Sequence, residues 1–200
     1  MANTPIPGFQ PARVRSGSPI TFRRCLVLTN NTTAIFKGDA VKVTAAGDYV
    51  VATSVNTAIS SVMYGGAVYT DTSSIRREAQ FLPAATLYTS TVIDPDNASY
   101  IYVVDDELDT EFRASGTTVI AQTNLFNTFA MLLGAGSTTT GLSGHSIDNS
   151  TSVTTNTFPW RLVDFVRGSA DTDPQLASAA CYFRINRSAS EPALGDGTGT

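Results

Sequence analysis

The only histidine of this 200-residue chain, His145, is the first residue whose type could do chemistry. It lies within residues 134–157, a run made mostly of Thr, Ser, Gly and Asn. Nucleophilic catalysis needs a nucleophile, a base and a third group that orients the base. One His among many hydroxyls does not specify such a set, and the sequence has no nucleophile elbow, phosphate-binding Gly loop or HExxH motif. We therefore predict that His145 is a solvated loop residue without a catalytic role.

A cluster of acidic residues is the second candidate for chemistry. Two carboxylates could act as an acid and a base, as in glycoside hydrolases, and several could bind Ca²⁺. The spacing lacks the glycine and the final Glu of an EF-hand loop, and a chain with one Trp is poor in the aromatics that line carbohydrate clefts. A solvated acidic turn is the favoured interpretation, with Ca²⁺ left open and no metal or other cofactor expected. The cluster consists of Asp94, Asp96, Asp105, Asp106, Glu107, Asp109 and Glu111.

The two cysteines, Cys25 and Cys181, have no metal-binding or redox spacing. Cys181 falls on the apolar face of an expected strand, which predicts a buried free thiol. The N-terminus has no hydrophobic signal region, and no run approaches the 18 apolar residues of a membrane helix. We expect a protein made in the cytosol that does not enter a membrane.

The elements that must position these residues are strands. Residues 179–186 alternate apolar and polar side chains, which is typical of a half-buried strand, and residues 160–167 are apolar on both faces, which predicts a central one. Gly65 and Gly66 predict a bulge, and residues 74–81 form a helical turn at most. The class is all-β, a compact barrel or sandwich. Strands are expected at 39–44, 49–53, 59–70, 100–104, 117–121, 128–133, 160–167 and 179–186.

The N-terminal segment differs from this body. Residues 1–20 hold four of the nine prolines, so the segment should be extended. Residues 1–38 carry a charge of +5, which leaves −9 for the remainder of a chain with net charge −4. Such sparse arginines favour docking on an acidic protein surface over binding nucleic acid. We predict an extended Pro-rich arm and lead-in strand (1–37), a β-rich body (38–187) and a flexible tail (188–200). The arm's contact residues are Ile6, Phe9, Arg13, Val14, Arg15, Arg23 and Arg24.

The surface is expected to be neutral and rich in hydroxyl groups. Charged residues make up 15% of the chain, where about 25% is usual, and Lys occurs only at Lys37 and Lys42. Such a surface lacks the charge that keeps a monomer apart from its neighbours. We interpret it as a surface that other subunits cover.

Three stretches together resemble a known family. They are "GFQPARVRSGSPI" near the N-terminus, "YIYVVDDELDTEF" in the middle, and "GAGSTTTGLSGHSIDNSTSVTT" with the strands that follow it. The family that they resemble is the capsid decoration, or cement, proteins of tailed bacteriophages. Two positions depart from its pattern: Arg113 follows Phe where the family tends to have an acidic or polar residue, and Phe165 replaces a smaller residue.

The resemblance implies a structural virion protein on the outer surface of the phage head. Its expected partners are the major capsid protein and copies of itself, most often as a homotrimer, and residues 1–37 become a capsid-binding arm. The hydroxyl-rich run is then a close-packed interface loop, whose hydroxyls satisfy a neighbour's backbone groups without adding charge. The interface residues are Thr138, Thr139, Thr140, Leu142 and Ser143.

Two other functions stay open from the sequence. A trimeric head-fibre or tail adhesin that binds host-surface glycans is also β-rich and rich in Thr and Ser, but it predicts aromatic platforms at an exposed tip. A glycan hydrolase requires the acidic cluster to line a cleft.

Overall fold

The computed structural model describes residues 3–27, 32–45, 47–56, 58–84, 98–106, 108–167 and 177–186. In these residues the chain forms twelve β-strands and one short 3₁₀ helix, which confirms the all-β prediction. In chain order the elements are β1 (Gln10–Val14), β2 (Phe22–Val27), β3 (Ala40–Val43), β4 (Tyr49–Val51), β5 (Ser61–Thr70), β6 (Arg76–Ala79), β7 (Ser99–Val104), β8 (Thr110–Ser115), η1 (Gln122–Asn124), β9 (Thr128–Leu132), β10 (Ser146–Val153), β11 (Trp160–Phe165) and β12 (Ala180–Ile185).

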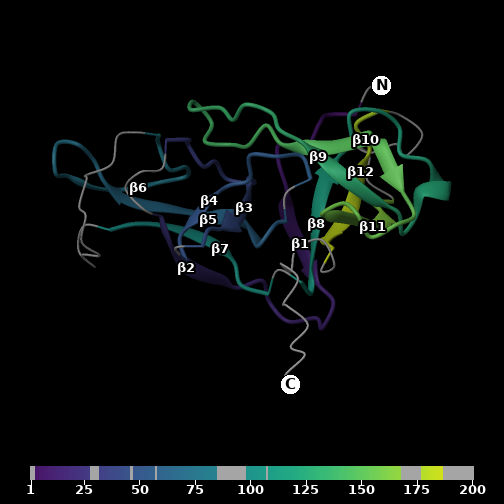
Figure 1. Ribbon diagram of the computed structural model, residues 1–200, viewed down its shortest axis with the longest axis horizontal. Coiled ribbons are helices and arrows are strands. Elements are labelled where there is room, and N and C mark those ends of the chain that lie inside the picture. Colours follow the sequence, from purple (N-terminus) through teal and green to yellow (C-terminus); the bar gives the residue numbers. More distant parts are fainter. Residues whose placement is uncertain are drawn as a thin grey trace, which may run out of the picture.

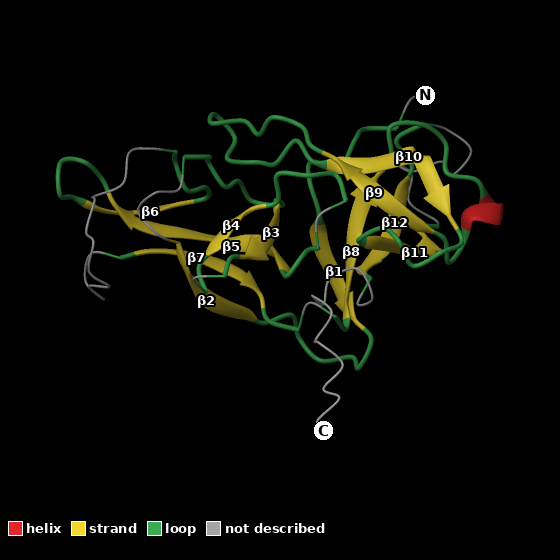
Figure 2. Cartoon of the chain, viewed as in Figure 1, coloured by secondary structure: helices red, strands yellow, loops and turns green. Residues whose placement is uncertain are grey.

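The strands form two antiparallel sheets that pack together as a β-sandwich. Sheet I has the order β1-β8-β12-β11-β9-β10. Sheet II has the order β2-β7-β5-β3-β4, with β6 paired to β5 outside this path. Sheet II occupies the left half of Figure 1 and most of sheet I the right half, and Figure 2 shows how little of the described chain is helical. The chain enters sheet I with β1, builds sheet II from β2 to β7, and returns to sheet I with β8.

The strand pattern predicted from alternation is confirmed in β11 and β12. Cys181, Phe183 and Ile185 of β12 are buried, whereas Tyr182 and Arg184 between them are partly exposed. β11 lies in the interior of sheet I, between β12 and β9, as its apolar composition predicts. The bulge in β5 is also confirmed, because its register against β7 shifts between Met63 and Ala67.

Two local predictions are wrong. Residues 117–121 are not a strand, because the side chain of Asn149 satisfies their backbone instead of a neighbouring strand: it accepts from the Thr117 N–H and donates to the Thr118 carbonyl. Residues 74–81 contain strand β6 where a helical turn was expected, because β6 finds a partner in β5. Pairing with another strand decides such a short segment over its local propensity.

Trp160 lies at the centre of the larger core. Its ring stacks on Phe9, with centroids 4.0 Å apart, and meets the edge of Phe112 at 5.6 Å. This core joins the inner face of sheet I to Val62 and Val104 of sheet II. A smaller core of sheet II residues is separate from it. Packing across the two sheets is therefore what fixes their relative position.

The extended N-terminal arm is not confirmed. Phe9 is buried in the core, β1 pairs with β8, and β2 pairs with β7, so residues 9–27 are integral to both sheets. β1 is an edge strand, and an edge tolerates Pro11, which cannot donate a ladder hydrogen bond. The predicted boundary at residue 37, between an arm and the β-rich body, therefore does not separate β1 and β2 from the sheets. The predicted tail, 188–200, lies outside the described residues.

Candidate functional site

The bridging loop, residues 134–145, connects β9 to β10 and binds the two halves of the sandwich to each other. It extends from sheet I over sheet II in Figure 1. The Lys37 N–H donates to the Gly141 carbonyl at 3.0 Å, and the Ser143 N–H donates to the Lys37 carbonyl at 2.9 Å. The loop that the resemblance places at an interface with another subunit thus packs against its own chain.

Glycines allow the two sides of this loop to approach each other. A Cβ atom on Gly134 would collide with the Gly144 carbonyl, and one on Gly136 would collide with the ring of Phe36. Phe36 in turn stacks on Phe81, with centroids 5.1 Å apart. The loop is consequently held as rigid structure by backbone contacts that side chains would prevent.

A buried polar cluster lies where the loop meets sheet II. His145 is 5% exposed and Asp39 is 2% exposed, and His145 Nδ1 lies 3.7 Å from Asp39 Oδ1. The Asp39 carboxylate accepts from the Phe36 N–H at 2.8 Å. The prediction that His145 is a solvated loop residue is wrong, because the bridging loop folds back and covers it.

Burial dominates the electrostatics of this pair. It raises the pKa of the Asp39 carboxyl above its usual value, against the opposing effects of His145 and the hydrogen bonds. It lowers the pKa of His145, with Asp39 acting in the opposite direction. Loss of solvation thus disfavours the charged form of each group, and we infer that His145 is neutral at pH 7.

Ser, His and Asp meet in this cluster, but not in the arrangement of a nucleophile and its base. In that arrangement the His ring lies between the other two groups. Here Ser143 Oγ accepts from the backbone N–H of His145 at 3.0 Å, and His145 Nδ1 has no hydrogen-bond partner among the described residues. Ser143 is also 4% exposed and packs beneath Gly8, so a substrate cannot reach its oxygen in this structure. The geometry supports a structural role.

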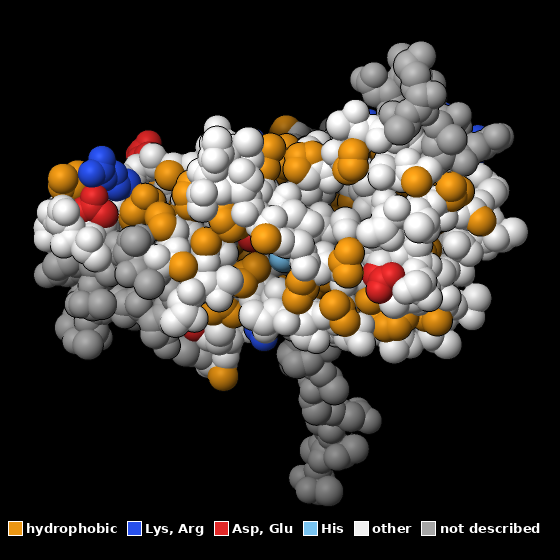
Figure 3. All heavy atoms as spheres, turned by 90° about the horizontal axis from the view of Figure 1, so that it is seen from above, with side chains coloured by type: hydrophobic (Ala, Val, Ile, Leu, Met, Phe, Trp, Pro, Cys, Tyr) orange, Lys and Arg blue, Asp and Glu red, His pale blue; other side chains and the backbone are white. Residues whose placement is uncertain are grey.

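A groove runs between the two halves above this cluster. The exposed apolar side chain of Leu133 lines it, and near it in the chain Leu132 is also exposed, while the Met131 N–H donates to the Val55 carbonyl at 3.2 Å. On the face seen in Figure 3, Lys and Arg gather at one end, whereas the middle is mostly apolar or uncharged. The apolar part of its lining consists of Ala34, Phe36, Val51, Ala52, Leu133 and Ala135, and Thr33, Thr53, Asp39 and His145 supply the polar part.

The predicted interface residues divide into two groups. Thr138, Thr139 and Thr140 are exposed at the tip of the bridging loop. Leu142 is partly buried and Ser143 is buried, and both contact Lys37 or its neighbours within the chain. Of these five residues, the three threonines are therefore the most exposed to another molecule, and Leu142 is exposed in part.

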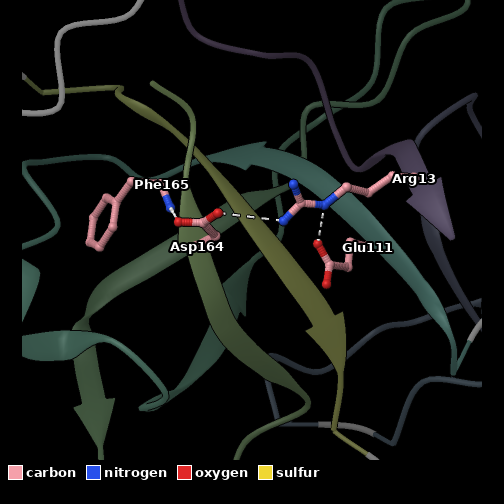
Figure 4. Close-up of polar contacts among 4 residues, drawn as sticks. All are labelled: Arg13, Glu111, Asp164 and Phe165. Atoms are coloured by element: carbon pink, nitrogen blue, oxygen red, sulfur yellow. Dashed lines mark hydrogen bonds and ion pairs between the residues drawn. The ribbon is translucent and has the colours of Figure 1, made fainter. Parts of the chain in front are cut away.

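The predicted arm residues contact the chain's own acidic cluster. Arg13 Nε donates to Glu111 Oε2 at 2.5 Å, and its other end reaches Asp164 at 3.5 Å across β12 (Figure 4). Arg23 lies 3.7 Å from Asp105. Through Arg13 and Arg23, the opposite charges of the two chain segments thus meet inside one molecule.

The remaining predicted contact residues have separate positions. Ile6 is partly buried and its N–H donates to Ser115 Oγ at 2.9 Å. Val14 is buried in β1, and the guanidinium of Arg24 lies over the ring of Tyr100 at 4.5 Å. Arg15 is exposed where β1 ends.

The acidic cluster is partly described. Asp109 accepts from the backbone N–H groups of Arg15 and Ser16, through its carbonyl and its side chain respectively, so this turn supports the connection that follows β1. Within the described part of the chain, no three His, Cys, Asp or Glu side chains are placed to hold a metal ion. Asp94, Asp96 and Glu107 lie outside the described residues.

Asp39 and the groove were missed from the sequence. Asp39 stands at the start of a predicted strand, and no spacing rule connects it with His145. The one available signal was that Asp39 directly precedes the apolar strand β3. An Asp at such a position is rarely buried without partners.

Comparison with protein-family models, with curated proteins and with solved structures gives no match to this chain. None of the helices in the described ranges has the length and apolar character that crossing a membrane requires.

Proposed function

We propose that this chain is a structural virion protein that binds the outside of a tailed-bacteriophage head and bridges subunits of the major capsid protein. The proposal starts from the three stretches that resemble capsid decoration proteins. The observation that carries it further is the largely uncharged surface around the groove, where Leu133 is 37% exposed and its chain neighbour Leu132 is 42% exposed. Depletion of charge together with exposed apolar side chains is typical of the centre of a protein–protein interface.

Rigidity supports the same function. The groove and the loop tip are held by backbone hydrogen bonds and by glycine contacts, so little conformational entropy is lost when a partner binds. A decoration protein requires such a preformed surface because it acts by contact alone. We also propose a homotrimer, whose linked copies would add avidity on a symmetric capsid.

The test uses heads of the phage that encodes this chain, stripped of the protein. Purified protein should cosediment with the heads and raise the temperature at which they release DNA, and cryo-electron microscopy should place it on the outer surface. Leu132→Asp with Leu133→Asp should abolish binding. Ile75→Asp, at an equally exposed apolar residue in the β5–β6 turn, is the matched control and should bind normally.

Two results would contradict the proposal. One is failure of the folded wild type to bind stripped heads at micromolar concentration. The other is saturable binding of the isolated protein to host-surface glycans without head binding, which would establish the adhesin function. A sedimentation mass of 21.1 kDa in solution, together with single copies on the head in cryo-electron microscopy, would contradict the trimer.

A further inference from the structure

A polar hollow at one end of sheet I is distinct from the groove. It forms where β1, β11 and β12 end or begin and where the turn between β7 and β8 passes. Three arginines from separate parts of the chain converge there, together with two aspartates and two asparagines, of which Asn156 bonds to Arg161. These residues are Arg15, Arg161, Arg184, Asp106, Asp109, Asn156 and Asn186.

The arginines of this hollow are not fully neutralised. Arg161 donates to the Phe126 carbonyl at 3.2 Å and to Asn156 Oδ1 at 3.1 Å, and neither contact supplies a negative charge. The side chains of Arg15 and Arg184 make no hydrogen bond or ion pair with any residue that the structure describes. Burial lowers the pKa of Arg184, and repulsion from Arg15 and Arg161 lowers it further, against Glu111 and Asp109. Guanidinium groups held together in this way attract an anion.

The charges of the hollow indicate which anion fits. Among the residues that line the hollow, three arginines and two aspartates leave one net positive charge, which a single negative charge balances; nearby Glu111 is paired with Arg13. A carboxylate carries that charge, and its planar pair of oxygens matches the fork of a guanidinium. A phosphate dianion would be repelled by Asp106 and Asp109, and the net charge of −4 opposes a polyanion such as nucleic acid.

The backbone of an exposed aromatic residue contacts one arginine of the hollow, Arg161. Phe126 is 60% exposed and has a φ of 69°, a left-handed conformation that is unfavourable for a bulky side chain. Its backbone is held there because its N–H donates to the Leu162 carbonyl at 3.0 Å and its carbonyl accepts from Arg161. Strained residues that their surroundings hold in place cluster at binding sites. Aromatic and Arg side chains together are typical of interface residues that carry most of the affinity.

We propose that this hollow binds a carboxylate of a partner protein, an Asp or Glu side chain, with Phe126 as the adjoining apolar contact. Arg184 and Arg15 hold the carboxylate, and Arg161 positions Phe126. That the partner is the capsid protein rests on the proposed function, whereas binding of the carboxylate does not.

The first experiment measures carboxylate binding directly. Arginine Nε–Hε signals of the ¹⁵N-labelled protein are followed by NMR during titration with sodium acetate, sodium phosphate and sodium chloride at matched ionic strength. Acetate should shift the Arg184 signal in a saturable way, and Arg184→Gln should weaken acetate binding about tenfold, as loss of one charge-assisted contact implies. Arg77→Gln, which alters an arginine paired with Asp71 at the far end of sheet II, should change nothing. Equal responses to acetate and chloride, or tighter binding of phosphate, would overturn the proposal.

The second experiment identifies the source of the carboxylate. Arg184→Gln and Phe126→Gly should each reduce binding to stripped heads, while Phe126→Gly keeps or raises the melting temperature because glycine adopts a positive φ without strain. Undiminished head binding by both variants, or a preference for glucuronate-bearing glycans over acidic peptides, would overturn the protein partner. Saturable acetate binding by a wild type that binds no heads would support the site and refute head binding.

Discussion

Phe9 stacks on Trp160, with ring centroids 4.0 Å apart and planes inclined by 18°. Both side chains are fully buried, and the contact joins the N-terminal segment to the central strand β11. The apolar residue that an extended arm would have offered to a capsid is therefore part of the chain's own core.

Phe9→Ala should destabilise the folded protein by about 3–5 kcal/mol, because it leaves a cavity against Trp160. Urea unfolding followed by Trp160 fluorescence measures this loss. Ile6→Ala is the matched control; Ile6 is only partly buried, so its loss should be roughly 1 kcal/mol. Equal stability of the two variants would contradict the burial of Phe9.

Gly8→Ala should cost more stability than Gly17→Ala, although both glycines have a positive φ, 65° and 78°. A Cβ on Gly8 would lie 2.6 Å from the Cβ of Ser143 and 2.7 Å from the Gly38 carbonyl oxygen, whereas a Cβ on Gly17 meets nothing within 4 Å. Gly17→Ala then carries only the conformational cost, about 1–2 kcal/mol. Thermal unfolding of the two variants compares them, and a smaller loss for Gly8→Ala would mean that the junction of the two halves is looser than described.

Acidification below about pH 6.5 should lower the free energy of unfolding through His145. Folded His145 has a lowered pKa and stays neutral, so the unfolded state binds more protons, and stability falls by at most about 1.4 kcal/mol per pH unit. Asp39 acts with the opposite sign: its raised pKa favours the folded state at low pH, and this contribution is lost as the pH rises from 3.8 through its folded pKa.

The chain has one His, so His145→Gln isolates this effect. The melting temperature of the wild type should decrease more steeply between pH 7.5 and 5.5 than that of the variant. Parallel pH profiles would show that His145 is not held neutral.

Cys181 should be unreactive in the folded protein. Burial raises the pKa of its thiol to about 12, with a further contribution from Asp164, so almost no thiolate is present at pH 8. In a Cys25→Ser variant, which leaves Cys181 as the only thiol, labelling by a disulfide reagent should occur only after unfolding in guanidinium chloride. Rapid labelling of the native variant would refute the burial of Cys181.

Local patterns predicted much of the sandwich because they report local physics. Alternation along Cys181, Phe183 and Ile185 identified a half-buried strand, since side chains of a strand point to opposite faces in turn. Gly65 and Gly66 identified the bulge in β5 for a comparable reason, because a register shift needs residues that tolerate unusual backbone geometry. Neither inference required knowledge of the strand's partner.

The candidate site was predictable only in part. Thr138, Thr139 and Thr140 are exposed at the tip of the bridging loop, and their contact with another subunit stays a prediction. The burial of His145 was missed, because it depends on a carboxylate from sheet II and on glycines that let the bridging loop fold back. The hollow with Arg184 was missed for the same reason, since its arginines come from three separate segments.

The sequence by itself determined the all-β class, several of the strands, the scarcity of charge and the separation of a basic N-terminal segment from an acidic remainder. Only the tertiary structure decided what these features contact. Prolines and arginines specify an extended basic segment equally well whether its partner is another protein or the same chain. Residues 9–14 are bound within the molecule by three contacts. β1 pairs with the edge of β8, Phe9 stacks on Trp160, and Arg13 pairs with Glu111. Such long-range pairing depends on which surfaces meet after folding, and no local spacing encodes it.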